Sequence, residues 1–191
     1  ADSVALAIRC GDILVVHTSD FKIDFTPIDG KQTDLHRFSE LGKEGVTLLL
    51  ADSTNVERPG YTVSESIVGE TFLELFRGVE SRIIVATFAS NIHRVQQIIN
   101  AAAHYNRKVV VSGRSMVNVV SVSSELGYLK IPKGTLIDIN DIKKYSDDQI
   151  VIITTGSQGE PMSGLSRMSV SEHRKLQISK GDLVIISATP I

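Results

Sequence analysis

The chain has 191 residues, of which 42% are hydrophobic and 22% charged, and its formal net charge is -2. This composition is typical of a globular protein with one sizeable core, or with one domain and part of another, and it excludes extended disorder. No apolar run approaches the ~20 residues that span a bilayer, and the first residues lack a signal-peptide pattern, so we expect neither membrane insertion nor secretion. The single cysteine, Cys10, cannot form an internal disulfide, which suits a cytoplasmic protein.

The first third of the sequence predicts β structure around one helix. Apolar runs at 4–8 and 13–17 flank a Gly-Asp turn, which predicts a hairpin. A helical pattern follows at 34–41, with Gly42 as its expected end, and residues 46–50 predict a buried strand.

From Ser64 onward the pattern alternates between helices and strands. The first predicted helix starts at Ser64, carries Ile67, Phe72, Leu75 and Phe76 on its apolar face, and ends near Gly78. The other predicted helices cover 91–105, 115–126 and 141–145, and the predicted strands cover 82–87, 108–112, 136–139, 150–154 and 182–187. We therefore predict an α/β fold with a mostly parallel, doubly wound (Rossmann-like) sheet, preceded by a β-hairpin and a strand.

Small and hydroxyl-bearing residues follow three of these strands, at 87–91, 112–115 and 154–159. The carboxyl ends of parallel strands share one edge of a sheet, where helix N-termini and glycines such as Gly156 and Gly159 can present N–H groups to a phosphate. The same residues also suit ordinary turns, and Asn91 and Ser115 are good helix caps with or without a ligand. Both interpretations stay open at this point.

Charge is distributed unevenly along the chain. No Asp or Glu occurs between Ser81 and Ser124. That interval contains the basic residues Arg82, His93, Arg94, His104, Arg107, Lys108 and Arg114. Such a segment is what a phosphate-binding surface needs, although solvated helix and loop positions explain it equally well.

Five stretches together resemble one family, the bacterial ribonuclease J family. They are HTSDFKIDFTP at 17–27, ADSTN at 51–55, ATFASNIHR at 86–94, SGRSM at 112–116 and TGSQGEPM at 155–162. The resemblance implies a metallo-β-lactamase-fold ribonuclease with an inserted β-CASP domain, which acts as a 5′-to-3′ exonuclease and an endonuclease in RNA processing and decay. It assigns residues 1–58 to part of the metallo-β-lactamase domain, at the end of its first segment, and residues 59–191 to the β-CASP domain.

The resemblance also implies a centre of two zinc or manganese ions in the full-length enzyme. Asp20 matches a carboxylate that bridges two metals, and Asp52 matches one that orients a metal-bound histidine. Each aspartate also suits an ordinary turn at a strand end. Ser19 replaces the family's usual glycine, and the family's His-x-His-x-Asp-His motif is absent from these 191 residues. We therefore expect this chain alone to hold no metal and to be inactive, with the histidine ligands in segments before residue 1 and after residue 191.

The expected substrate is single-stranded RNA. The predicted RNA contacts are Asn91, His93, Arg94, Arg114, Ser115, Ser157, Gln158 and Gly159. We expect a homo-oligomer in the full-length form, association with other RNA-decay proteins, and no membrane partner. Two alternatives remain: a small-molecule phosphate-binding or sugar-phosphate isomerase-like domain, and a structural domain that covers the active site and supports assembly.

Overall fold

The computed structural model describes residues 3–54 and 56–188. The chain forms two compact units, residues 1–66 and 67–191. Helix α2 (Glu65–Phe76) begins in the first unit and continues into the second. The domain boundary expected after residue 58 stays a prediction. In the part of the chain that the structure describes, no helix combines the length and the apolar character needed to cross a membrane.

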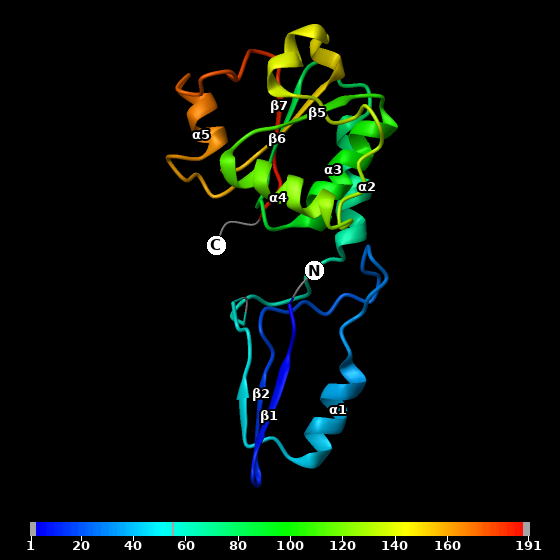
Figure 1. Ribbon diagram of the computed structural model, residues 1–191, viewed down its shortest axis with the longest axis vertical. Coiled ribbons are helices and arrows are strands. Elements are labelled where there is room, and N and C mark those ends of the chain that lie inside the picture. Colours follow the sequence, from blue (N-terminus) through cyan, green and yellow to red (C-terminus); the bar gives the residue numbers. More distant parts are fainter. Residues whose placement is uncertain (1–2, 55, 189–191) are drawn as a thin grey trace. The chain divides into compact units, whose positions relative to one another are not determined.

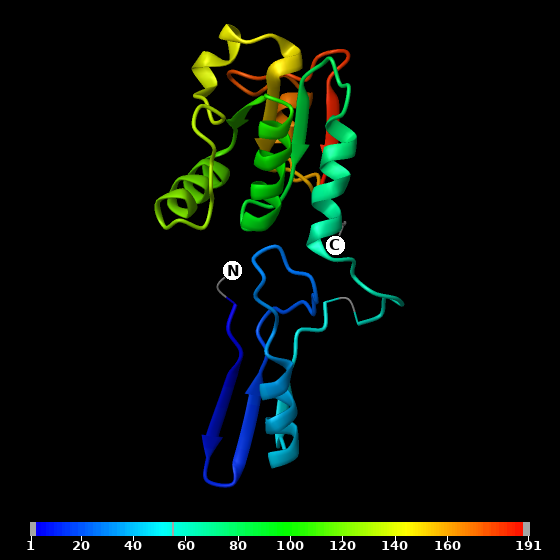
Figure 2. The ribbon, with the colours of Figure 1, turned by 90° about the vertical axis from the view of Figure 1, so that its right-hand side faces the viewer.

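The first unit contains a small mixed sheet and one helix. Strands β1 (Leu6–Cys10) and β2 (Ile13–His17) form the predicted antiparallel hairpin, and β3 (Leu48–Leu50) pairs in parallel with β2. Helix α1 (Leu35–Glu44) lies alongside these strands (Figure 2). The core of this unit consists of Leu14, Val16 and Leu41, with Phe38 and Val46 packed against them.

Two predictions for this unit are wrong. The helix does not end at Gly42 but continues to Glu44, and Gly45 caps it. The φ of 95° at Gly45 takes the backbone out of the helix, while the Gly45 N–H donates to Leu41 O. The strand at 46–50 is shorter than predicted and is exposed at all three positions, because the described residues of this unit form their core around β2 and α1.

The second unit is the predicted α/β sheet. Strands β4 (Ile83–Ala86), β5 (Lys108–Val111), β6 (Ile150–Thr154) and β7 (Leu183–Ile186) are all parallel, in the order β5-β6-β4-β7. Alternate residues of the strands face opposite layers, so the central strands β4 and β6 are buried on both faces. This confirms the predicted fold class.

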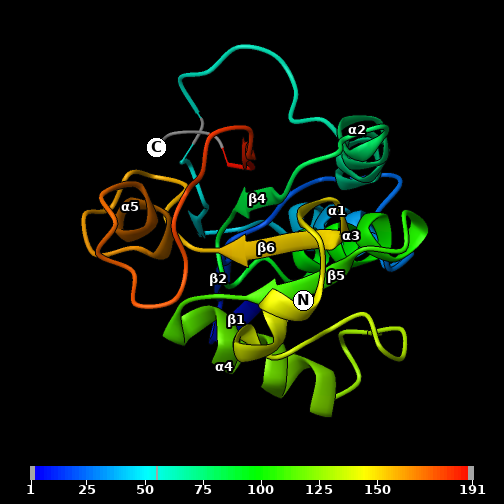
Figure 3. The same ribbon diagram turned by 90° about the horizontal axis from the view of Figure 1, so that it is seen from above.

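Helices cover both faces of this sheet (Figures 1 and 3). Phe72 and Phe76 of α2, with α3 (Ile92–His104) and α4 (Arg114–Glu125), pack on the face that includes Ile83 and Val85. Met168 of α5 (Gly164–Ser169) and Leu176 pack on the face that includes Ile84 and Ile152. The predicted apolar stripe of α2 is only half right, because Ile67 and Leu75 are exposed.

Other differences concern short elements. Residues 136–139 form a single parallel bridge between Val109 and Leu136 rather than a strand, and the short helix at 139–144 has 3₁₀ geometry. The sequence pattern did not predict α5. Its six residues begin with a glycine and include three polar side chains, which leaves too short an apolar stripe to detect.

Candidate functional site

The carboxyl edge of the four-stranded sheet brings the three predicted loops together. Hydrogen bonds continue between the strands past their ends, from Thr87 N–H to Thr154 O at 3.0 Å and from Ser112 N–H to Ile153 O at 2.8 Å. On the outer side, Ser187 N–H donates to Ala86 O at 2.8 Å. The loops after β5, β6 and β4 are therefore neighbours in that order along one edge.

The loop after β4 uses its polar residues to hold the structure. Asn91 caps α3, since its Oδ1 accepts a hydrogen bond from Arg94 N–H at 3.0 Å. The Arg94 guanidinium in turn donates to Ser187 O at 3.1 Å and to Ser187 Oγ at 2.7 Å, which fastens the end of β7 to the first turn of α3. His93 is half-buried in the same turn. All three predicted contact residues thus lie at the edge, and two of them have structural tasks there.

The loop after β5 presents an exposed cation. Arg114 is the first residue of α4 and is exposed, and Ser115 follows it inside the helix. The expected capping role of Ser115 is wrong, because the cap position is Gly113 and no side chain caps this helix. Gly113 has a φ of 100°, and a Cβ there would lie 3.4 Å from Thr155 Oγ1. That distance is an ordinary contact, so it is the backbone conformation at the start of α4, rather than the neighbouring β6 loop, that favours glycine here.

The loop after β6 is the most tightly packed of the three. Gly156 has a φ of 114°, and a Cβ there would lie 2.9 Å from Leu165 Cβ and closer still to Ser163 Oγ. This glycine is therefore required by the packing of α5 against the loop, whereas its expected purpose was to let a phosphate approach. Gly159, with a φ of 74°, has open space around its Cα and closes a turn to Gly156 O.

Two hydroxyls in this loop are buried. Ser157 is 6% exposed and Thr154 is fully buried, and their Oγ atoms have no hydrogen-bond partner among the described residues. Unsatisfied buried hydroxyls are rare and call for an explanation, such as an ordered water or a bound group. The neighbouring Gln158 N–H donates to the Glu160 carboxylate at 3.1 Å, so an anion at this amide would have to displace that side chain.

His173 is a residue of this edge that the sequence analysis missed. Its Nε2 lies 3.0 Å from Ser112 Oγ, at the end of β5, and its Nδ1 accepts hydrogen bonds from Lys175 N–H and Leu176 N–H. Burial, assisted by the positive charge of Arg167, lowers the pKa of His173 below its usual range. The available sequence signal was weak: a single histidine in a polar stretch that follows no strand.

The basic segment does not form one continuous surface, and this corrects one of the two interpretations of the sequence. Arg82 and Arg107 precede β4 and β5, at the opposite, amino edge of the sheet. Arg107 is 4% exposed and donates to the carbonyl oxygens of Ser81, Val79 and Ile150. Of the basic residues between Ser81 and Ser124, the carboxyl edge retains His93, Arg94 and Arg114.

Asp20 and Asp52 follow neighbouring parallel strands of the first unit. His17 and Leu50 are paired in the register of β2 and β3, and Asp52 N–H donates to Thr18 Oγ1 at 3.1 Å. Both carboxylates therefore lie just past the same edge of the small sheet. Hydrogen bonds from the Thr54 hydroxyl and N–H lower the pKa of Asp52, with a further contribution from Phe21 N–H, so this carboxyl is ionised at neutral pH.

Ser19 adopts the backbone conformation that a glycine would adopt. Its φ is 53°, in the left-handed region, and its hydroxyl donates to Val4 O at 2.8 Å. Serine therefore adopts a left-handed turn before Asp20, and its hydroxyl makes a hydrogen bond that a glycine could not make. Asp20 itself is exposed.

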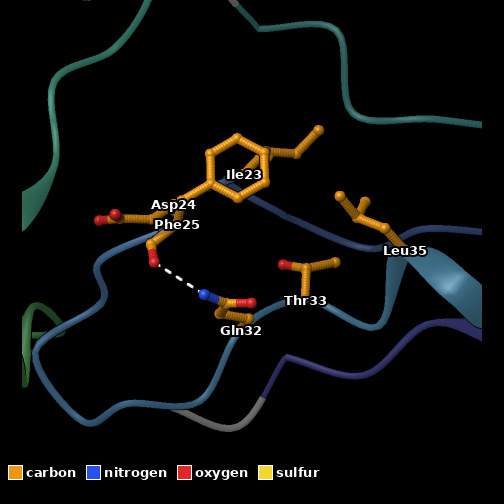
Figure 4. Close-up of a pocket in the computed structure, with 6 residues that line it drawn as sticks. All are labelled: Ile23, Asp24, Phe25, Gln32, Thr33 and Leu35. Atoms are coloured by element: carbon orange, nitrogen blue, oxygen red, sulfur yellow. Dashed lines mark hydrogen bonds between the residues drawn. The ribbon is translucent and has the colours of Figure 1, made fainter.

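A pocket lies in the segment that connects β2 to α1 (Figure 4). It is lined by Ile23, Asp24, Phe25, Gln32, Thr33 and Leu35. Burial opposes ionisation of Asp24, but hydrogen bonds from Ser64 Oγ and from the N–H groups of Thr26 and Glu65 outweigh it and lower the pKa of this carboxyl. None of the predicted site residues lines this pocket, and Asp24 serves the start of α2.

The described residues contain no group of three or more His, Cys, Asp or Glu side chains placed to hold a metal ion. Asp20 offers one hard oxygen ligand of the kind that divalent cations prefer, and Asp52 is already engaged with Thr54. The two carboxylates fit part of a metal centre, and further ligands would be needed to complete it.

The family model for the β-CASP domain of ribonuclease J matches residues 80–191. A ribonuclease J from Helicobacter pylori is 50% identical over 190 residues, and one from Mycolicibacterium smegmatis is 51% identical over 188 residues; the chain is covered to 100% and 98% in these matches. A ribonuclease J from Synechocystis is 46% identical over the whole chain. The chain spans 28%, 34% and 30% of the length of these three relatives. The match to the family model covers most of the second unit and the similarity to the relatives extends through the first, so this chain belongs to the ribonuclease J family.

Proposed function

We propose that this chain is the RNA-contacting β-CASP portion, with flanking metallo-β-lactamase strands, of a metal-dependent ribonuclease that acts on single-stranded RNA. One observation carries the proposal: the carboxyl ends of β5, β6 and β4 are adjacent, and their loops offer an exposed guanidinium, buried hydroxyls and amide groups in a row. Single-stranded RNA is bound by such combinations of cations and hydrogen-bonding groups. The family of the chain supports this choice over a sugar-phosphate isomerase, which would not account for the Asp20 and Asp52 segments.

Each predicted contact residue has a role that its chemistry and position allow. The exposed guanidinium of Arg114 would pair with a phosphate. Gln158 and Gly159 would contact the RNA through amide and backbone groups, as would Ser115 in the first turn of α4 through its hydroxyl. The Ser157 hydroxyl is buried, so it would contact the RNA only once the β6 loop opens around it. Asn91, His93 and Arg94 would form the β4 side of the same surface, with Asn91 and Arg94 keeping their hydrogen bonds to the protein.

In the full-length enzyme, two zinc or manganese ions would act as Lewis acids and activate the attacking water. Asp20 would help to hold both ions with its exposed carboxylate, a hard oxygen ligand. Asp52, held by Thr54 and Phe21 N–H, would orient a metal-binding histidine supplied by another segment. This chain alone is therefore expected to be inactive.

The wider role of the full-length enzyme follows from the family. It would act as a 5′-to-3′ exonuclease and an endonuclease in the cytoplasm, in ribosomal RNA processing and mRNA decay. We expect it to form a homo-oligomer and to associate with other RNA-decay proteins.

Fluorescence anisotropy of a labelled single-stranded oligoribonucleotide tests RNA binding by the purified chain. We expect saturable binding that weakens as salt is raised, because phosphate contacts release counterions. Thermal shift with sugar phosphates is the matched test of the alternative. Stabilisation by a sugar phosphate with no RNA binding would overturn the proposal, and RNA hydrolysis by this chain with added Zn²⁺ or Mn²⁺ would contradict its expected inactivity.

A further inference from the structure

His173 connects two elements that are far apart in the sequence. Its Nε2 lies 3.0 Å from the hydroxyl of Ser112, which is 2% exposed and directly follows β5. Its own N–H donates to Arg167 O, near the end of α5, at 3.0 Å. The ring thus joins the α5–β7 connection to the strand end from which Gly113 and Arg114 emerge.

The hydrogen bonds determine where the imidazole carries its proton. Nδ1 accepts from Leu176 N–H at 3.1 Å and from Lys175 N–H at 3.3 Å, so it cannot itself carry a hydrogen. A neutral ring then has its hydrogen on Nε2, which donates to Ser112 Oγ. The Leu176 side chain is buried in the core beside Ile84 and Ile152. Packing therefore also anchors the backbone whose N–H groups donate to Nδ1.

We propose that His173 is a positioning residue for the carboxyl edge: as a neutral Nε2–H imidazole it holds Ser112, and through it the Gly113–Arg114 turn, beside the β6 loop. Protonation gives Nδ1 a hydrogen that faces two N–H donors, which breaks both bonds and loosens the link to Ser112. The edge should therefore be ordered at neutral pH and looser in acid. The consequence for RNA binding rests on the proposed function, whereas the positioning itself does not.

The charges around the ring favour its neutral form. Arg167 of α5 is the charged group that faces it from another element, and β5 contributes the uncharged Ser112. On its own segment Glu172, Arg174 and Lys175 are the ionisable neighbours, and the Lys175 ammonium is 2.6 Å from Asn140 Oδ1. Burial and Arg167 both lower the pKa of His173, so its ring should take up a proton at a lower pH than an exposed histidine does.

Two matched variants separate the link to Ser112 from the local turn. Ser112→Ala removes the hydroxyl and leaves both bonds to Nδ1. His173→Asn keeps a side-chain oxygen that can accept from the following N–H groups and removes the donor to Ser112. His36→Asn, at an exposed histidine of α1, is the control.

Hydrogen exchange on the intact chain between pH 5 and 8, corrected for intrinsic rates, is the primary measurement. We expect the amides of 112–115 to exchange about fivefold faster in both variants than in the wild type at pH 7.5, as the loss of one hydrogen bond implies. The wild type should approach the exchange rates of the variants at pH 5, while His173→Asn shows no such pH dependence. Unchanged protection in Ser112→Ala, or a wild-type pH profile in His173→Asn, would overturn the inference.

RNA anisotropy on the same proteins provides the functional measurement. Both variants should bind the oligoribonucleotide about fivefold more weakly at pH 7.5, and the double variant no more weakly than either single one, since both remove the same link. If the losses of RNA affinity in the two single variants added up in the double variant, the two residues would not act through one shared hydrogen bond. If the wild-type chain binds no RNA, the proposed function fails, and the exchange experiment still decides whether His173 positions the edge.

Discussion

The two edges of the parallel sheet use their arginines differently. At the amino edge, Arg107 is buried among backbone carbonyls, and Arg82 forms a two-point ion pair with Asp182, at 3.0 Å and 2.7 Å. At the carboxyl edge, Arg94 fastens the end of β7 to α3, whereas Arg114 is exposed at the start of a helix. Both amino-edge arginines therefore hold the structure together, and the carboxyl edge in addition keeps one exposed cation available to a ligand. Residue type alone does not distinguish these two roles.

The largest expected effect is at Arg107. Arg107→Met should lower the free energy of unfolding by about 4 kcal/mol. The reason is that the carbonyl oxygens of Ser81, Val79 and Ile150 would lose the guanidinium that donates hydrogen bonds to them inside the protein. Urea unfolding followed by circular dichroism measures it. Arg77→Met, at an exposed arginine just after α2, should change stability by less than about 0.5 kcal/mol. Equal effects at both sites would show that the amino edge does not depend on this residue.

The next effect concerns the ion pair that fastens the edge strand β7. Asp182→Asn should cost about 3 kcal/mol, since the Asp182 side chain is 3% exposed and its loss removes the buried counter-charge of Arg82. Asp147, 3.8 Å from the same guanidinium and 73% exposed, provides the matched control. Asp147→Asn should cost less than about 1 kcal/mol. Thermal unfolding of the two variants would contradict this ranking if Asp147→Asn were the more damaging change.

A smaller effect distinguishes two glycines of the β6 loop. Gly156→Ala should cost about 2 kcal/mol, through a φ of 114° and a clash with Ser163 and Leu165. Gly159→Ala has no steric clash, because nothing lies within 4 Å of the added Cβ. It strains only the backbone, whose φ is 74°, and should lower the free energy of unfolding by about 1 kcal/mol. If instead Gly159→Ala were the one to abolish RNA binding while the fold stays intact, the loop backbone would be a direct contact.

The smallest effect should appear only in RNA affinity. Arg114→Gln should leave stability within about 0.5 kcal/mol of the wild type and weaken RNA binding by about 1 kcal/mol, or roughly fivefold. The slope of log affinity against log salt should fall by about 0.7, the value for one phosphate contact on a single strand. Anisotropy titrations at several salt concentrations measure both quantities. If the salt slope of Arg114→Gln equalled that of the wild type, Arg114 would not contact an RNA phosphate. Arg77→Met again supplies the control.

Much of the second unit could be predicted from local pattern. The β-branched runs at 83–86 and 150–154 are buried on both faces, and Asn91 caps its helix as predicted. The errors fall where local pattern competes with packing. Gly42 has the residue type of a helix end, yet the helix continues to Glu44, and Ser115 has the residue type of a cap, yet the chain turns into the helix at Gly113.

The sequence by itself determined the fold class and the loops that would meet at one edge, because alternation of strands and helices constrains a parallel sheet strongly. The family was recognisable from five stretches that resemble ribonuclease J. Only the tertiary structure decided which arginines hold the scaffold, why Gly156 must be glycine, and that His173 reaches Ser112 across 61 positions. These facts depend on which side chains meet after folding. Contacts between residues far apart in the chain leave no periodic signal in it, so their chemistry becomes visible only when the sheet is assembled.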